Sequence, residues 1–289
     1  MRALRTLAVA CLAAGVLTAC SSSGGSTETK AGSGSSAAAG AGASQGASAA
    51  ADGAAAAGAA SKLAPKDALL ASAAVMDKAG SAKLTLSGET EGTADYVWKT
   101  PSSFLMSTTD EGKEVKVLFA NDVMYVGVTA DMAAVAGNKK WMKLDPKAGG
   151  AAAGGADAGA FASMMQLMNP SVQLVTAAPG AKLVGAETVA GQSTTHYRSE
   201  VKVDDMVAKM QLAPELKAQV LAELKKKGNT ATADLWINAK GELVQQSNAD
   251  ASTAGAKPST IGYSKLGEVK ATPAPADADV FSLADLLKQ

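Results

Sequence analysis

Groups that carry most enzyme chemistry are scarce in this chain of 289 residues. It contains one histidine, His196, and two cysteines, Cys11 and Cys20. Zinc sites need several imidazole or thiolate ligands. A Ser-His-Asp triad on a nucleophile elbow needs a G-x-S-x-G motif between a strand and a helix, and none stands ahead of a predicted helix. The sequence therefore predicts no enzyme and no metal site, and it implies no cofactor.

An excess of positive charge is also missing. The chain has 27 basic and 27 acidic residues, and without Arg2 and Arg5 the balance is 25 against 27, a net charge of −2. Arg198 is then the one arginine left, so bidentate clamps for phosphate groups are nearly absent. This balance favours neither nucleic-acid binding nor attachment to anionic lipid through a basic patch.

The N-terminus carries an export signal. Arg2 and Arg5 form a basic start, and the apolar run 7–17 is far shorter than the roughly 20 residues that a spanning helix needs. The run ends in Leu-Thr-Ala followed by Cys20, which resembles the bacterial lipobox, where the cysteine thiol receives a diacylglyceryl group before cleavage. We expect residues 1–19 to be a lipoprotein signal peptide. The alternative, an ordinary signal peptide cut at an A-x-A-like site, leaves Cys20 without a role.

Lipidation at Cys20 leaves the mature chain without a free thiol, because Cys11 is lost with the signal. No disulfide can then form, so an apolar core must hold the fold. Acyl chains such as palmitate on Cys20 would anchor the protein to the extracytoplasmic face of the cell membrane without spanning it.

A low-complexity segment separates this anchor from the rest of the chain. After Cys20, residues 20–62 are almost wholly alanine, glycine and serine, with too little apolar surface to offset the entropy of ordering. We expect a disordered tether that holds the folded part roughly 35 Å from the bilayer on average. Residues 63–289 have the length of a single β-rich domain.

The first half of that domain begins with a helix and continues in strands. Residues 65–80 have Pro65 near the start and Gly80 as a stop. From Lys83 to Pro146 the alternation of apolar and polar residues predicts an antiparallel meander, with a hairpin turn at Asn121-Asp122.

The middle of the domain combines a second Gly/Ala-rich stretch at 147–160 with a methionine stripe. Phe161, Met164, Met165 and Met168 share one face of a predicted helix that Pro170 is expected to stop. Methionine is common at adaptable apolar binding surfaces, but a stripe at helical spacing is also typical of a core. The pattern alone leaves both interpretations open.

Strands and helices alternate in the second half. The segment 182–203 predicts a hairpin around Gly191-Gln192, two helices follow that meet at Pro214, and a last hairpin turns between Asn238 and Gly241 before a closing strand. His196 stands in the first of these hairpins. We expect it to pair with a neighbouring backbone or hydroxyl group, the alternative being a catalytic base.

Three segments carry a resemblance to a known family. They are the V-x-G-x-x-T-T-H-Y segment at 189–197, the D-L-W-I-N-x-x-G-E-L hairpin at 234–243, and a Pro-rich approach to Asp-Val-Phe at 279–281. With the order of the predicted elements, they resemble the actinobacterial LppX/LprG-like lipoproteins, relatives of the LolA/LolB carriers. The resemblance covers nearly all of the chain from Lys66 onward. The long tether and the insert at 147–160 depart from it.

This resemblance implies both a fold and a function. The fold is α+β, an unclosed antiparallel β half-barrel with helices covering its concave face. Members of the family bind lipids or acylated glycolipids in an apolar cavity and assist their transfer through the cell envelope, which implies a transport partner. Opposed to this carrier hypothesis is a non-enzymatic envelope adaptor or sensor with a filled core that acts through a protein partner.

Alternation along strands and spacing along helices suggest which side chains would line a cavity. In the strands, the candidates are Leu84, Leu86, Val117, Phe119, Met124 and Val126. In the helices, they are Phe161, Met165, Met168, Met206 and Met210.

Overall fold

The computed structural model describes residues 63–88, 90–110, 112–144, 165, 168–209, 214–248 and 258–282. The expected signal peptide, the lipidation site Cys20, the tether at 20–62 and the insert at 147–160 lie outside these residues. The cavity candidates Phe161 and Met210 do so as well.

The described fold is built on a sheet of twelve strands in the order β12-β6-β5-β4-β3-β2-β1-β11-β10-β9-β8-β7. Every neighbouring pair is antiparallel except β6 and β12. The sheet does not close, because β7 and β12 are its two edges. The predicted α+β half-barrel is confirmed. The strands are β1 (Ser81–Ser87), β2 (Gly92–Val97), β3 (Ser103–Asp110), β4 (Lys113–Ala120), β5 (Val123–Gly127), β6 (Trp141–Leu144), β7 (Ala181–Val189), β8 (Gln192–Lys202), β9 (Thr230–Asn238), β10 (Leu243–Asn248), β11 (Ser259–Ser264) and β12 (Val280–Ser282).

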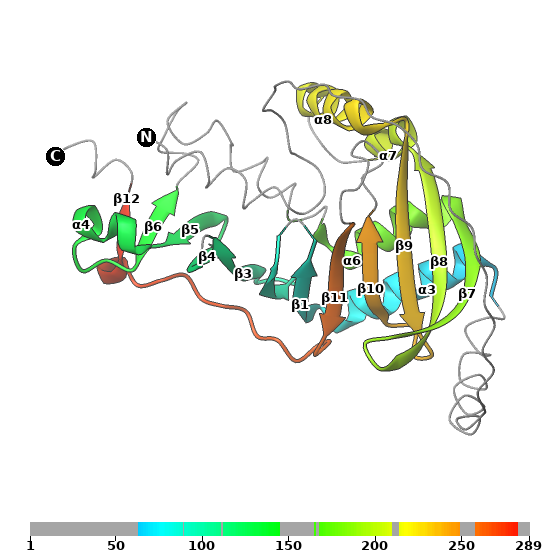
Figure 1. Ribbon diagram of the computed structural model, residues 1–289, viewed down its shortest axis with the longest axis horizontal. Coiled ribbons are helices and arrows are strands. Elements are labelled where there is room, and N and C mark those ends of the chain that lie inside the picture. Colours follow the sequence, from blue (N-terminus) through cyan, green and yellow to red (C-terminus); the bar gives the residue numbers. More distant parts are fainter. Residues whose placement is uncertain are drawn as a thin grey trace, which may run out of the picture.

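Two helices lie across the half of the sheet that runs from β7 to β11, as Figure 1 shows: α3 (Pro65–Ala79) and α6 (Pro170–Ala177). Two more, α7 (Val203–Lys209) and α8 (Pro214–Lys227), pack on each other at one end of β8 and β9. The short elements are η1 (Ala130–Met132), α4 (Ala133–Ala136), η3 (Ala178–Gly180) and η4 (Asp277–Asp279).

Helix α3 follows the prediction from its sequence. Pro65 occupies the first turn, where its missing N–H has no intrahelical acceptor to lose. Gly80 ends the helix in the left-handed conformation, with φ 74°, and its amide donates to the Met76 carbonyl over 3.2 Å.

Pro170 begins a further helix, α6, which was not predicted from the sequence, since its ring fits the first helical turn. Met165 and Met168 before it are helical and Asn169 is not, which agrees with the predicted end of a helix ahead of Pro170. Asn169 caps α6, because its side-chain oxygen accepts the Ser171 amide over 2.9 Å. The Asn-Pro pair was the sequence signal for the start of α6. The helix was missed because it is short and contains β-branched residues, which have low helix propensity.

The hairpin turns follow local backbone chemistry. Asn121 and Asp122 have φ of 54° and 61°, the left-handed pair of a type I′ turn, as predicted for the β4–β5 hairpin. The β7–β8 hairpin turns at Ala190 and Gly191, with φ of 50° and 74°, one residue earlier than predicted.

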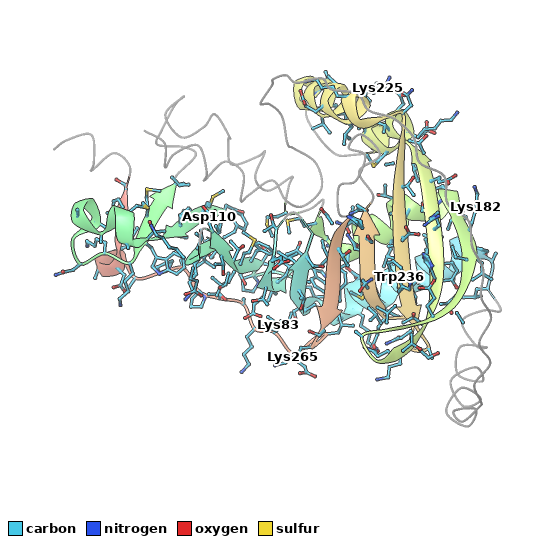
Figure 2. The ribbon with its side chains drawn as sticks, in the orientation of Figure 1. Lys83, Asp110, Lys182, Lys225, Trp236 and Lys265 are labelled. Atoms are coloured by element: carbon cyan, nitrogen blue, oxygen red, sulfur yellow. The ribbon has the colours of Figure 1, made fainter. Side chains whose placement is uncertain are left out.

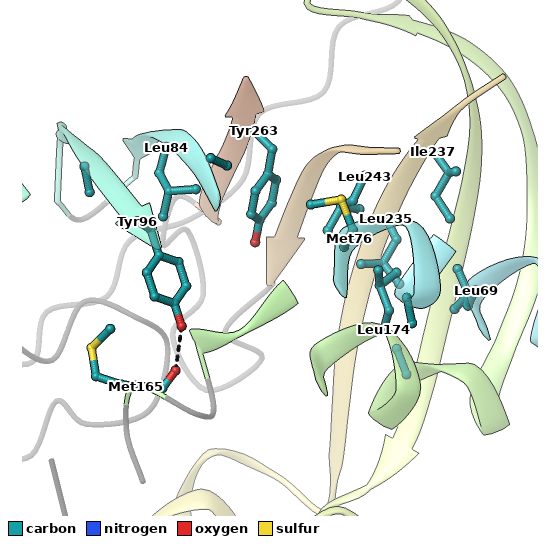
Figure 3. Close-up of a cluster of buried hydrophobic side chains, with 14 of the residues drawn as sticks. Leu69, Met76, Leu84, Tyr96, Met165, Leu174, Leu235, Ile237, Leu243 and Tyr263 are labelled. Atoms are coloured by element: carbon teal, nitrogen blue, oxygen red, sulfur yellow. Dashed lines mark hydrogen bonds between the residues drawn. The ribbon is translucent and has the colours of Figure 1, made fainter. Parts of the chain in front are cut away.

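The main core lies between the two helices and one face of the sheet, which we call the inner face. Leu69 and Met76 of α3 and Leu174 of α6 are buried there against Leu235 of β9 and Leu243 of β10 (Figure 3). The inner face is therefore the side of the half-barrel on which the main core is built.

The opposite, outer face is covered at the other end of the sheet by the C-terminal segment. After β11 the chain runs back along the sheet, and β12 pairs with β6 (Figure 1). Leu118 and Tyr125 on this outer face are buried against Ala274 and Val280 of that segment. The Thr272 amide also donates to the Ser103 hydroxyl over 2.9 Å.

Two neighbouring leucines of α3 test this packing. Leu69 is fully buried in the main core, whereas Leu70 is 37% exposed. We expect Leu69→Ala to lower the free energy of unfolding by about 2–5 kcal/mol and Leu70→Ala to change it by less than about 0.5 kcal/mol. Urea unfolding of both variants measures this, and equal losses would contradict the described orientation of α3.

Candidate functional site

The inner face carries one continuous row of apolar side chains. Strand register places eight of them directly opposite one another on adjacent strands, from β11 at one end to β12 at the other. Each is at most 8% exposed. The row reads Tyr263, Leu84, Ala94, Met106, Val117, Val126, Met142 and Phe281.

The strand residues proposed from the sequence all share this face. Leu84, Val117 and Val126 belong to the row itself. Phe119 and Met124 face each other two residues further along β4 and β5. Leu86 is partly buried against the main core. The guess about which side of each strand faces inward was therefore consistent across three strands.

Two of the helical candidates lie against the same face. Met165 is buried in the main core, and Met168 packs on it while partly buried. The Tyr96 hydroxyl donates to the Met165 carbonyl over 2.8 Å (Figure 3). This hydrogen bond ties the methionine segment to strand β2, over the inner face.

Met206 lies apart from these residues. It packs with Val203 and Val207 of α7 and Leu224 of α8, in a cluster separate from the main core. The structure thus brings together the candidates of β1, β4 and β5 with Met165 and Met168, and it does not bring Met206 to them.

Uncharged polar groups lie among the buried residues of the inner face. The Tyr263 hydroxyl donates to the Gln246 side-chain oxygen over 3.1 Å, and both residues are buried. Burial raises the pKa of Tyr96 and of Tyr263 well above the ordinary value for tyrosine. Sequence analysis missed these three residues, because a tyrosine or glutamine in an alternating strand gives no sign of its face before the register is known.

The outer face of β7, β8 and β9 carries a network around His196. Its Nδ1 lies 2.8 Å from Oε1 of Glu187, and its Nε2 lies 2.7 Å from Oδ1 of Asp234. Arg198 donates to both oxygens of Asp234, over 2.9 and 3.1 Å. The indole of Trp236 stacks on the imidazole, with 4.5 Å between ring centroids, and donates to Oε2 of Glu187 over 2.8 Å.

The expected partners of His196 were therefore wrong. Two carboxylates face its ring nitrogens, rather than a backbone or hydroxyl group. Both ring nitrogens are therefore already occupied by side chains of the protein itself. Only the strand register could have revealed this network, because Asp234 lies directly opposite Arg198 and Trp236 directly opposite His196.

Hydrogen bonds set the charge of the two carboxylates. The hydrogen bond from Trp236, which has the larger effect, and the one with His196 lower the pKa of Glu187 below its ordinary value. Burial alone would raise the pKa of Asp234, but hydrogen bonds from Arg198 and His196 outweigh it and lower that pKa too. Both groups are anionic at neutral pH, and their role is to fix Trp236 and Arg198 on the outer face.

The described residues hold neither a metal-binding cluster nor a membrane-spanning helix. Among them, no cluster of three or more His, Cys, Asp and Glu side chains is arranged to hold a metal ion. No helix in the described part of the chain has the length and hydropathy that crossing a membrane requires.

Comparisons with known proteins give relatives in sequence and in structure. No protein-family model matches the chain. An uncharacterised 31.2 kDa protein of Streptomyces griseus, from the rplA-rplJ intergenic region, is 30% identical over 204 residues. The match includes 68% of this chain and spans 65% of the relative's length.

Two solved structures resemble the described fold. LprF from Mycobacterium bovis matches 73% of this chain and 97% of its own, with 14% identity and a TM-score of 0.44. The Mycobacterium tuberculosis lipoprotein LppX matches 73% of this chain and 99% of its own, with 16% identity and a TM-score of 0.42.

The carboxylate of Glu187 makes a test of the outer network possible. The pKa of Glu187 is lower in the folded state than its ordinary value of 4.5. The carboxylate therefore stabilises the fold fully at a pH above 4.5, and this stabilisation is lost as the pH falls through the lower pKa of the folded state. We expect Glu187→Gln to be less stable than the parent at neutral pH, and the difference to shrink below pH 4.5.

Urea unfolding at a series of pH values measures this difference. Glu200→Gln is the matched control, since Glu200 pairs with Lys182 at an exposed position of β8 and such pairs contribute little. A Glu187→Gln difference that stayed constant down to the lowest pH would show that the carboxylate charge does not stabilise the network.

Proposed function

We propose that this protein is a membrane-anchored lipoprotein that binds lipid or acylated glycolipid on its inner face and assists its transfer through the cell envelope. The observation that carries the proposal is the row of eight apolar residues across strands β11 to β12. In the described part of the chain, α3 and α6 lie over the β7–β11 half of the sheet (Figure 1). The row continues beyond them over β2 to β6.

Such a face suits acyl chains for a physical reason. Apolar surface removed from water stabilises a complex by about 25 cal/mol per Å², and no covalent step is needed. The polar groups near the row, Tyr96 and Tyr263, are uncharged hydroxyls already paired with protein acceptors. They impose little cost on an apolar ligand.

Methionine supports the same proposal. Met106, Met124, Met142, Met165 and Met168 lie on or against the inner face. Unbranched thioether side chains repack readily, which allows one site to hold chains of different length. This is the binding interpretation of the stripe that the sequence left open.

The proposed anchor is the acyl group on Cys20, with residues 20–62 as the tether. Several acyl chains on one residue give long-lived membrane attachment, so the carrier domain would stay at the membrane while reaching partners in the envelope. A transport protein that delivers or receives the lipid is part of this proposal.

An adaptor with a filled core is the second candidate. The observation that favours it is that the row residues are already buried by the protein's own side chains. Trp236 and Arg198, fixed on the outer face, would then contact a protein partner, because such residues dominate many interfaces.

The substitution Met168→Lys separates the two candidates. In the carrier it places a charge against acyl chains, so lipid extracted from purified protein should fall several-fold while the melting temperature changes by only a few degrees. In the adaptor the same change charges a filled core and unfolds the domain. Mass spectrometry of the extract and a thermal melt, made on one sample, measure both.

Two controls sharpen this experiment. Met206→Lys makes the same change in the separate α7–α8 cluster, and His196→Ala changes the outer network. We expect both variants to keep the parent's lipid content within a few-fold. Loss of fold in Met168→Lys, with no lipid in the parent, would exclude the carrier.

The anchor has its own test. We expect Cys20→Ser to release the protein from the membrane fraction or to leave it unprocessed, because the proposed anchor is the lipid on that thiol. Fractionation in a salt wash, with the mass of the N-terminal peptide, measures the outcome. A processed Cys20→Ser protein that stayed with membranes through the salt wash would contradict the proposed anchor.

A further inference from the structure

Large exposed apolar side chains are few among the described residues, and all of them come from one group of elements. Among the described residues, five large hydrophobic residues are exposed, with exposed fractions from 37% to 52%. They are Leu63, Leu70, Val175, Leu183 and Val184.

These five residues come from three elements that touch one another. Leu63 precedes α3 and Leu70 lies within it, Val175 belongs to α6, and Leu183 and Val184 belong to β7. Helix α3 packs on both α6 and β7, and the three elements lie together at the β7 edge of the sheet (Figure 1). We call these residues the apolar corner. Apolar side chains left exposed on elements that pack together are candidates for a contact surface.

The position of Leu63 indicates what the corner contacts. It is the first described residue, and the proposed tether, residues 20–62, ends directly before it. The chain therefore leaves the domain at the corner itself. The alanine, glycine and serine of the tether have no large apolar side chains to cover it.

We propose that the apolar corner docks on the surface of the lipid bilayer to which Cys20 is anchored. This inference rests on the proposed anchor. A tether converts the contact into an intramolecular one, so a small apolar area is enough to hold the domain at the membrane. Lys182 of β7 (Figure 2) is exposed next to Leu183 and pairs with Glu200. Lys66 of α3 is exposed as well and can extend its ammonium group toward headgroups.

Docking would also orient the domain. A flexible tether alone leaves every face equally near the bilayer, whereas contact through α3, α6 and β7 places this edge of the half-barrel against it. Lipid then has the shortest path between the bilayer and the inner face.

Fluorescence quenching tests the proposal on the full, processed and lipidated chain. Leu183→Cys is labelled with an environment-sensitive dye and reconstituted in phosphatidylcholine–phosphatidylglycerol vesicles whose acyl chains are brominated. Lys116→Cys, on an exposed position of β4 far along the sheet from β7, is the matched control. We expect strong quenching and a blue shift at 183, and neither at 116.

A second substitution shows whether apolar contact is the cause. Val184→Asp in the chain labelled at 183 should reduce the quenching several-fold, because a carboxylate resists insertion among lipid chains. Thr188→Asp, the same charge further along β7 at an exposed position, should leave it within a factor of two. Equal losses in both variants would overturn the proposal.

The anchor and the docking fail in different ways. Without the anchor, the labelled protein does not float with vesicles, and Cys20 of the parent chain takes up the thiol label. Without docking, the protein floats but the label at 183 stays unquenched, which overturns the inference. An unquenched label together with a dimer in analytical ultracentrifugation would assign the corner to a second copy of the chain.

Discussion

An open sheet has two faces, and the fold of this one depends on burying the inner face across the eight strands from β11 to β12. Antiparallel pairing puts directly opposite residues on the same side, so the apolar residue chosen on one strand fixes the position that must be apolar on the next. From Tyr263 through Leu84 and Val117 to Phe281, that requirement is met on eight strands. A shift of one residue in any pair would turn the remaining strands' apolar side chains to solvent.

The two halves of the sheet hold their outer faces by different means. At β3 to β6 the returning C-terminal segment covers Leu118 and Tyr125 with apolar contacts. At β7 to β9 the outer face stays polar, and charged hydrogen bonds among Glu187, His196 and Asp234 bind the edge strand to its neighbours. Since charge-assisted hydrogen bonds are directional, they can secure an edge strand without apolar cover.

Local signals predicted the elements better than the contacts between them. Pro65, Gly80 and the Asn121-Asp122 turn act through their own backbone preferences, so α3 and the β4–β5 hairpin followed from sequence. Pro170 was predicted only as the end of a helix, and α6 was missed because proline also suits the first turn of the next one. One partner of His196, Asp234, is 38 positions away, and the parallel pairing joins β12 to β6 from a distant part of the chain. Periodicity within one segment contains no information about them.

The same limit explains the unequal outcome for the candidate lining residues. Alternation relates Leu84 to Leu86 and Val117 to Phe119 within a strand, and the sheet then brings the strands together, so those residues meet on the inner face. Helical spacing relates residues only within one helix. Met165 is held at the inner face by a hydrogen bond from the Tyr96 hydroxyl of β2 to its carbonyl, whereas Met206 packs against α8. The positions of strand residues on the inner face are therefore determined by the alternation and the strand register together. The position of each helix over that face depends on contacts that exist only in the folded chain.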